Sequence, residues 1–337
     1  MAAAGTHLCW LCVASLAFLG FLLVSVSEDT IGDSSKDTLQ GRLGSAKFLP
    51  CLNATIIGND SIMFVESSGK SNLDGRTSCA LESTAKHNPG RTVILWYHGE
   101  PFLNSNPFLR VLKNLPNVVL QNIKLEDTFK DTPLEPWYAR GIINRSLYPT
   151  VHLSDALRLV LLYKYGGAYM DIDIVDLKPL TGLKNCISES HQDMVANGFL
   201  FFERQHAFLL RCMQRFSRTY SPARWAENGP RIIRRVILNT CKRKQVRSVV
   251  GRTCEGVTVL PRKLLLPISY HGWRYYVSPR LAGAAWKAHN ESYVMHVFGA
   301  HSRKIKLREG DGSAYGQAAK LHCPMSFRTA VEHYGVF

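Results

Sequence analysis

Residues 153–180 read LSDALRLVLLYKYGGAYMDIDIVDLKPL, and this stretch decides the fold. Apolar positions recur in it at helical spacing, joined by a lysine whose aliphatic stem can extend the stripe: Leu153, Leu157, Val160, Leu161 and Lys164. Gly166 and Gly167 supply the positive φ that ends a helix and releases the chain into a strand. The stretch therefore predicts a helix followed by a buried strand.

Two aspartates, Asp171 and Asp173, accompany that strand. Because a strand points successive side chains to opposite faces, both carboxylates are expected on one face, with Ile172 and Ile174 on the other. Neighbouring carboxylates repel each other, so a cation is expected between them. They lie at or just past the carboxyl end of the strand, where open α/β sheets place ligands. Since carboxylates suit Mg²⁺, Ca²⁺ or Mn²⁺, the pattern predicts a divalent metal site.

The sequence before this stretch alternates between strand and helix patterns. SIMFVESSG, from residue 61, predicts a strand, RTSCALESTAKHNPG a helix closed by Asn-Pro-Gly, and RTVILWYHG a second strand. PFLRVLKNL and NVVLQNI continue the pattern with one more helix and one more strand. Strand, helix and strand in such short succession predict an α/β protein with parallel strand pairing.

The chain ahead of this unit is organised for export. Residues 8–26 are uncharged and apolar, long enough to cross a bilayer as a helix of roughly 20 residues. The segment reads as a membrane anchor, although the small residues at 25–27 leave a cleaved signal peptide open. The expected domains are a cytoplasmic N-terminus at 1–7, the anchor at 8–26, a lumenal stem at 27–60 and a catalytic domain at 61–337.

Two further features agree with a lumenal or extracellular address. Four Asn-X-Ser/Thr sequons are candidate glycosylation sites: Asn53, Asn59, Asn144 and Asn290. Seven cysteines follow the apolar segment: Cys51, Cys79, Cys186, Cys212, Cys241, Cys254 and Cys323. Seven is odd, so at least one stays free or pairs between chains. Cys241 and Cys254 bracket a short basic loop and are the expected intrachain pair.

The formal net charge is +15, with basic clusters at residues 231–235 and 242–247. Each cluster is either a solvated surface or a region that attracts anionic substrates or a membrane surface. Nucleic acid is not expected as a partner, because the clusters carry no interleaved aromatic residues and the chain has no recognition motif.

Residues 153–180 resemble the DxD region of the alpha-1,4-glycosyltransferase family, whose members include lactosylceramide 4-alpha-galactosyltransferase (globotriaosylceramide synthase) and alpha-1,4-N-acetylglucosaminyltransferase. Further segments that share the resemblance are DTPLEPWY (131–138), NGFLFFERQHAFLLRCM (197–213), NGPRIIRRV (228–236), GVTVLPRKLLLPI (256–268) and YVMHVFGAHSR (293–303). The resemblance thus runs from about residue 61 to the C-terminus.

The resemblance implies a GT-A fold, with a mostly parallel sheet between helices, and a retaining, metal-dependent glycosyltransferase. The implied reaction moves galactose from UDP-Gal in alpha-1,4 linkage onto a terminal beta-galactoside, as in a glycosphingolipid such as lactosylceramide. The implied location is the Golgi membrane, with a single type II span and the catalytic domain in the lumen. UDP-GalNAc or UDP-GlcNAc as donor, or a glycoprotein acceptor, remain alternatives. A non-catalytic lumenal carbohydrate-binding protein and a Ca²⁺-dependent lectin-like module are remoter ones.

By the same resemblance, Asp171 and Asp173 bind Mn²⁺ and the UDP diphosphate. Asp155 and Arg158 lie one helical turn apart and can face the same pocket. The resemblance implies that they contact the donor sugar, and the alternative is an ion pair on the helix surface. A carboxylate nucleophile is not required, since same-face attack guided by the leaving group also retains configuration.

Other implied roles are less specific. His296 lies in a predicted late strand and completes the metal shell or donates to the departing diphosphate, unless it is a hydrogen-bonded core histidine. Asn197, Gly198 and the turn at 228–230 line the donor or acceptor cleft. Trp137 and Tyr138 are expected to be buried aromatic residues, with a sugar-stacking platform as the alternative. The weak candidates for a nucleophile are Asp193 and Glu203.

Overall fold

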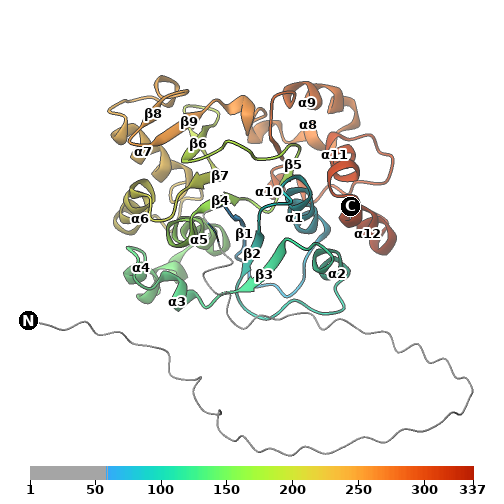
Figure 1. The fold of residues 1–337 in the computed structure, drawn as a ribbon, viewed down its shortest axis with the longest axis horizontal. Coiled ribbons are helices and arrows are strands. Elements are labelled where there is room, and N and C mark those ends of the chain that lie inside the picture. The colour runs from blue at the N-terminus through green and yellow to red at the C-terminus, as the bar shows by residue number, and fades with distance from the viewer. Residues whose placement is uncertain (1–57, 59) are drawn as a thin grey trace, which may run out of the picture. The chain divides into compact units, whose positions relative to one another are not determined.

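The structure, a computed structural model, describes residue 58 and residues 60–337. Its centre is an eight-stranded sheet in the order β3-β2-β1-β4-β7-β6-β9-β8, beside a two-stranded sheet of β10 and β5 (Figure 1). The strands are β1 (Ile62–Glu66), β2 (Val93–Tyr97), β3 (Val118–Asn122), β4 (Gly167–Met170), β5 (Ile174–Asp176), β6 (Cys186–Glu189), β7 (Val195–Phe202), β8 (Thr253–Cys254), β9 (Val257–Leu260) and β10 (Val294–His296).

Four of the sheet's neighbouring pairs are parallel, namely β3 with β2, β2 with β1, β1 with β4, and β6 with β9. The remaining three pairs, β4 with β7, β7 with β6, and β9 with β8, are antiparallel. The predicted α/β class with a mostly parallel sheet is therefore confirmed. The change of direction falls between β4 and β7, next to the predicted metal site.

Helices cover both faces of this sheet (Figure 1). They are α1 (Gly75–His87), α2 (Pro107–Lys113), α3 (Leu125–Phe129), α4 (Glu135–Ala139), α5 (Pro149–Tyr165), α6 (Ala207–Thr219), α7 (Pro230–Thr240), α8 (Arg274–Val277), α9 (Ala282–Ala288), α10 (Gly299–Ser302), α11 (Ala314–His322) and α12 (Pro324–Tyr334). Side chains of β1 alternate between the two faces of the sheet and so contribute to two hydrophobic cores. Ile62 and Phe64 belong to the core with α1, α11 and α12. Met63 and Val65 belong to the core with α5, α6 and α7.

Helix α5 confirms the prediction made from its apolar spacing. Pro149 opens it at a position where the missing N–H costs nothing, and Gly166 ends it with φ of 71°. Gly167 follows with φ of 105°, and a Cβ there would collide with the Ser61 carbonyl. That carbonyl accepts from the Ala168 N–H at 2.9 Å, so glycine is needed for β4 to approach β1.

The prediction that Asp171 and Asp173 lie just past the carboxyl end of a strand is confirmed, but the expectation that strand alternation places them on one face is wrong. Strand β4 ends at Met170, the next three residues form a turn closed by the Ile174 N–H donating to the Asp171 carbonyl at 3.1 Å, and β5 starts a different sheet. The chain leaves the large sheet because β5 pairs with β10. The two carboxylates therefore converge through a turn and not through strand alternation.

The predicted disulfide between Cys241 and Cys254 is confirmed, and a second one joins Cys79 in α1 to Cys323. Cys186 and Cys212 are buried free thiols, and Cys51 lies outside the described residues. A buried thiol at both positions agrees with the expectation that some cysteines remain unpaired.

The predicted anchor at 8–26 and the sequons at Asn53 and Asn59 lie outside the described residues. Within the described part of the chain, no helix has the length and apolarity that a membrane crossing requires. The sequons at Asn144 and Asn290 are both exposed, which leaves both accessible to a glycan.

Asp176, at the end of β5, makes the free energy of unfolding depend on pH. It is fully buried, the Asn88 side-chain amide donates to its Oδ2 at 3.0 Å, and its Oδ1 has no hydrogen-bond partner. Burial raises the pKa of Asp176 to about 7, against the opposing hydrogen bond from Asn88. The folded state therefore holds this proton more tightly than the unfolded chain between about pH 4 and pH 7.

Because the raised pKa belongs to the folded state, the free energy of unfolding should fall as pH rises through that window. We expect Asp176→Asn to remove a slope worth a few kcal/mol across it, measured by denaturant unfolding at pH 5 and pH 8. Glu309→Gln, at an exposed carboxylate, is the matched control and should keep the wild-type slope. An Asp176→Asn slope equal to that of wild type would contradict this assignment.

Candidate active site

A cleft of about 400 Å³ opens at the carboxyl end of β4, within the range of ~300–1,000 Å³ usual for small-ligand sites. It is lined by the DxD turn, β7, the end of β10, the start of α7 and the segment around residue 270. All seven residues predicted to bind the metal or the donor line it: Asp155, Arg158, Asp171, Asp173, Asn197, Gly198 and His296. The structure thus brings together side chains that are up to 141 residues apart, from 155 to 296.

The DxD carboxylates meet His296 at the floor of the cleft. The His296 Nε2 lies 3.0 Å from Asp173 Oδ1 and 3.9 Å from Asp171 Oδ2. The antiparallel register that places His296 opposite Ile174 delivers the imidazole to the turn. Burial alone would lower the pKa of His296, but the facing Asp173 carboxylate raises it above the usual value. His296 lines the cleft and faces both carboxylates, so the alternative of a core histidine does not hold.

Backbone groups fix the orientation of Asp173. The Gly299 N–H donates to its Oδ2 at 2.5 Å, and the Val297 N–H donates to its carbonyl at 3.1 Å. Phe298 lies between these donors with φ of 53°, a strained conformation for a bulky residue. Burial alone would raise the pKa of Asp173, but His296 and the Gly299 N–H hold it below its usual value. Asp173 is thus held ionised in a defined direction.

Arg158 supplies the second cation of the site. It is buried, its Nη1 lies 3.1 Å from Asp171 Oδ1 and donates to the Asn197 carbonyl at 2.6 Å, and its Nη2 lies 3.3 Å from Asp155 Oδ1. Burial opposes its charge, but Tyr169 and the carboxylates of Asp171 and Asp155 raise its pKa. The pair Asp155–Arg158 faces the cleft as predicted, and the alternative of a surface ion pair is wrong.

Asp155 and Asn197 leave polar atoms unused at the cleft wall. Asp155 Oδ1 accepts from the Asn197 side-chain amide at 2.6 Å, whereas Asp155 Oδ2 and Asn197 Oδ1 are buried without a partner. Burial raises the pKa of Asp155 to about 6, against the lowering effect of Arg158. Buried acceptors rarely go unbonded in folded proteins, so these two oxygens are available to donors from a ligand.

The remaining predicted residues lie in different surroundings. Pro230 lines the cleft, while Asn228 is buried and hydrogen-bonded to the backbone of Ser221. Trp137 is buried among aromatic rings, as expected, and Tyr138 stacks on Phe129 away from the cleft.

Neither weak candidate for a nucleophile lines the cleft. Asp193 pairs with Arg234, and Glu203 pairs with Lys184 at 2.6 Å on the surface.

Sequence reasoning missed several residues of the site. The Tyr169 hydroxyl donates to Asp171 Oδ1 at 2.7 Å, and Trp225, Tyr270 and His301 line the cleft. For Tyr169 a signal was present, because it stands two residues before Asp171. The aromatic run SYHGWRYY at 269–276 was a second signal, since exposed aromatic side chains in a loop suit sugar binding.

The donor set fits a divalent metal. One ligand atom each from Asp171, Asp173 and His296 lies within 4.8 Å of the others. Two carboxylate oxygens and an imidazole nitrogen are ligands that Mn²⁺ accepts, and three protein ligands leave positions open for substrate oxygens. A cation was expected between the two aspartates. In the structure the imidazole of His296 faces both carboxylates, and the guanidinium of Arg158 pairs with Asp171.

Comparison with known proteins agrees with this geometry. Residues 74–193 match the glycosyltransferase sugar-binding region containing the DXD motif, and residues 201–330 match the alpha 1,4-glycosyltransferase conserved region. Lactosylceramide 4-alpha-galactosyltransferase of Rattus norvegicus is 30% identical over 272 residues, 80% of this chain and 75% of the relative. The chain belongs to the alpha-1,4-glycosyltransferase family.

Two human relatives differ in the activity that their names give. Lactosylceramide 4-alpha-galactosyltransferase of Homo sapiens is 32% identical, covering 78% of this glycosyltransferase and 75% of the relative. Alpha-1,4-N-acetylglucosaminyltransferase of Homo sapiens is 28% identical, covering 83% and 84%. The mostly parallel sheet between helices that the structure shows is the GT-A-like arrangement expected for this glycosyltransferase family.

Gly198 offers a test of how tightly the DxD turn is packed. A Cβ at this position would collide with the Asp171 carboxylate, whereas a Cβ at Gly283 in α9 would meet nothing within 4 Å. We expect Gly198→Ala to displace Asp171 and to weaken Mn²⁺ binding by about tenfold or more, measured by isothermal titration. Gly283→Ala, the matched control, should bind as wild type does. Unchanged Mn²⁺ affinity in a folded Gly198→Ala protein would remove Asp171 from the ligand set.

Proposed function

We propose that this glycosyltransferase moves galactose from UDP-Gal, with retention of configuration, in alpha-1,4 linkage onto a terminal beta-galactoside of a glycosphingolipid such as lactosylceramide. The observation that carries the proposal is the convergence of the DxD turn, His296 and the buried Asp155–Arg158 pair in one cleft. The named activity of the rat and human relatives supports this donor and acceptor.

In this proposal Asp171, Asp173 and His296 hold Mn²⁺. When bound, the metal would neutralise the negative charge that gathers on the diphosphate as its bond to the sugar breaks. Asp173 is positioned for this role by the Gly299 N–H, and Asp171 by the Tyr169 hydroxyl. The chain thereby orients both carboxylates before any ligand arrives.

Arg158, Asp155 and Asn197 are proposed to hold the donor sugar. The free oxygens of Asp155 and Asn197 can accept from sugar hydroxyls, and Arg158 keeps Asp155 in place. The relative that is named as an N-acetylglucosaminyltransferase favours UDP-GlcNAc as the second candidate donor. A few side chains around the sugar decide between these donors.

Same-face attack is the proposed route to retention. Among the described residues, the only carboxylates that line the cleft are Asp155, Asp171 and Asp173. The last two face His296, and Asp155 is engaged by Arg158 and Asn197. Asp193 and Glu203 lie outside the cleft, and among the described cleft carboxylates the free oxygen of Asp155 is assigned in this proposal to the hydroxyls of the donor sugar and not to nucleophilic attack.

Trp225 and Tyr270 are proposed to receive the acceptor. Both rings line the cleft and both are 44% exposed, unusually open for side chains of this size. Aromatic faces stack on the apolar face of a galactose ring, which would leave its hydroxyls directed to the polar cleft. A glycoprotein acceptor could use the same rings, so a comparison of glycolipid and glycoprotein acceptors in the transfer assay decides the aglycone.

We further propose a Golgi membrane location with a single type II span. The apolar run at 8–26 and the exposed sequon at Asn144 support it. A membrane-attached enzyme would meet a glycolipid acceptor at the surface where that acceptor lies.

The first experiment incubates the full chain, in neutral detergent, with UDP-Gal, Mn²⁺ and a lactoside. We expect an added hexose that an alpha-galactosidase removes, detected by mass, and a loss of about a hundredfold or more in kcat for Asp173→Asn. Glu203→Gln, a surface carboxylate outside the cleft, is the control and should keep wild-type turnover. UDP and Mn²⁺ binding without transfer would move the proposal to another donor or acceptor, and a folded protein that fails to bind UDP would refute it.

Loss of the Trp225 or the Tyr270 ring should weaken binding of the acceptor and leave binding of the donor unchanged. We expect Trp225→Ala and Tyr270→Ala each to raise KM for the lactoside about fivefold to tenfold, as loss of a stacking contact of ~1 kcal/mol or more implies. UDP affinity should not change. Trp225→Phe should restore most of the binding, and Tyr334→Ala, at an exposed aromatic on α12, is the control. A change in UDP affinity without a change in acceptor KM would assign the rings to the donor.

A further inference from the structure

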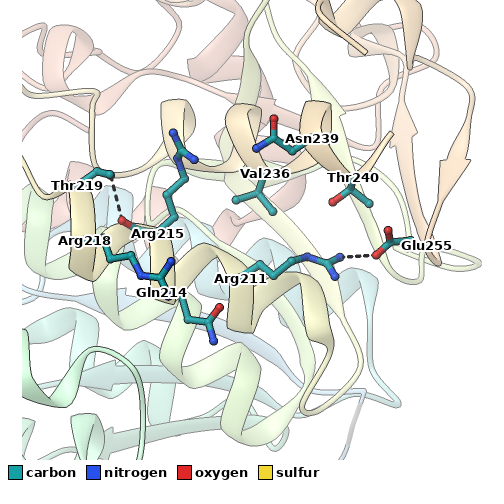
Figure 2. Close-up of a pocket in the computed structure, with 9 residues that line it drawn as sticks. All are labelled: Arg211, Gln214, Arg215, Arg218, Thr219, Val236, Asn239, Thr240 and Glu255. Atoms are coloured by element: carbon teal, nitrogen blue, oxygen red, sulfur yellow. Dashed lines mark hydrogen bonds and ion pairs between the residues drawn. The ribbon is translucent and has the colours of Figure 1, made fainter. Parts of the chain in front are cut away.

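A second hollow lies over α6 and α7, with a volume of about 390 Å³ (Figure 2). We call it the arginine groove, after Arg211, Arg215 and Arg218, which project from one face of α6 at intervals of four and three residues. Its other lining residues are Gln214, Thr219, Val236, Asn239, Thr240 and Glu255. None of these residues lines the cleft that holds the DxD turn.

The charges in the groove are unbalanced. Figure 2 shows Arg211 extended toward Glu255 at one end, with Arg215 and Arg218 at the other. Arg211 Nη2 lies 2.9 Å from Glu255 Oε2, but these side chains are 38% and 58% exposed, so the pair contributes little. No described carboxylate pairs with Arg215 or Arg218. Three guanidinium groups therefore share one carboxylate.

Two donors in the groove are both hidden and unused. The Nε atoms of Arg211 and Arg215 are buried from solvent and have no hydrogen-bond partner among the described residues. A buried donor without an acceptor is costly, so its persistence points to an acceptor outside the described part of the chain. The amide of Asn239 and the hydroxyl of Thr240, at the end of α7, are neutral donors beside the guanidinium groups.

We propose that the arginine groove is a phosphate-binding site. Guanidinium groups match phosphate oxygens with paired N–H donors, and amide and hydroxyl groups complete such a site. A phosphate would supply the negative charge and the acceptors that the groove lacks. The phosphate group can belong to a lipid headgroup at a membrane surface or be free in solution. The proposal is independent of the transferase reaction, because the two sites share no residue.

Arginine-selective modification tests the proposal on the full chain. Phenylglyoxal labelling in neutral detergent micelles would be compared with labelling in micelles that contain phosphatidic acid, and with labelling in inorganic phosphate, reading each arginine by mass spectrometry. We expect Arg215 and Arg218 to be protected severalfold, while Arg243, exposed on the loop after α7, is not. Protection by phosphatidic acid alone identifies a lipid headgroup, and protection by inorganic phosphate identifies a free ligand. Equal protection of Arg243, or none in either condition, overturns the proposal.

A pair of double variants separates a built site from general attraction. Whichever probe protects the wild type, phosphatidic acid micelles or inorganic phosphate, should bind to Arg215→Gln/Arg218→Gln about tenfold more weakly or worse. Arg243→Gln/Lys244→Gln removes the same charge outside the groove and should bind as wild type does. Equal weakening in both would overturn the proposal. If the first double variant is unstable, Arg218→Gln alone, at an exposed position, should still weaken binding and leave lactoside transfer unchanged.

Discussion

The buried guanidinium of Arg158 is the interaction on which the cleft depends. Asp155 is almost fully buried and Asp171 is three-quarters covered, so both carry charge in a place where an unpaired carboxylate would be costly. Arg158 lies 3.1 Å from one and 3.3 Å from the other, and it also bonds the Asn197 carbonyl. One side chain of α5 thereby fixes the DxD turn after β4 and the start of β7 in a single arrangement.

The position of β4 in the sheet explains why these groups meet. Strand β4 pairs in parallel with β1 on one side and antiparallel with β7 on the other. Because β7 runs the opposite way, Asn197 and Gly198 near its start lie beside the end of β4, and the Asp171 N–H donates to the Gly198 carbonyl at 3.0 Å. Ligands in open α/β sheets bind at the carboxyl ends of strands where the strand order reverses. The cleft lies at the carboxyl end of β4, the strand with which the chain crosses to the other side of β1.

Local sequence patterns predicted the parts of this arrangement that depend on near neighbours. The helix at α5, its glycine end, the Asp155–Arg158 pair and the Cys241–Cys254 disulfide all join residues within 17 positions of each other. The turn that brings Asp171 and Asp173 together was not predicted, and strand alternation was expected in its place, because the cause of the turn is remote in sequence. Strand β5 leaves the large sheet to pair with β10, which begins at Val294, and no local pattern records that pairing. The disulfide of Cys79 with Cys323 spans 244 residues and was beyond the same reasoning.

The three residues that could hold a metal therefore come from two regions that have to fold together. Asp171 and Asp173 lie in the region matched by the DXD model, which ends at residue 193, and His296 lies in the region matched by the alpha 1,4-glycosyltransferase model, which begins at residue 201. Strand β10 carries His296 against β5, and both strands pack in the same core as α1, α11 and α12. The disulfide from α1 to Cys323, which opens α12, closes that core around them. The group of Asp171, Asp173 and His296 is thus complete only when the C-terminal core is formed, so any metal held by this group would depend on the integrity of that core, although α11 and α12 supply none of the three residues.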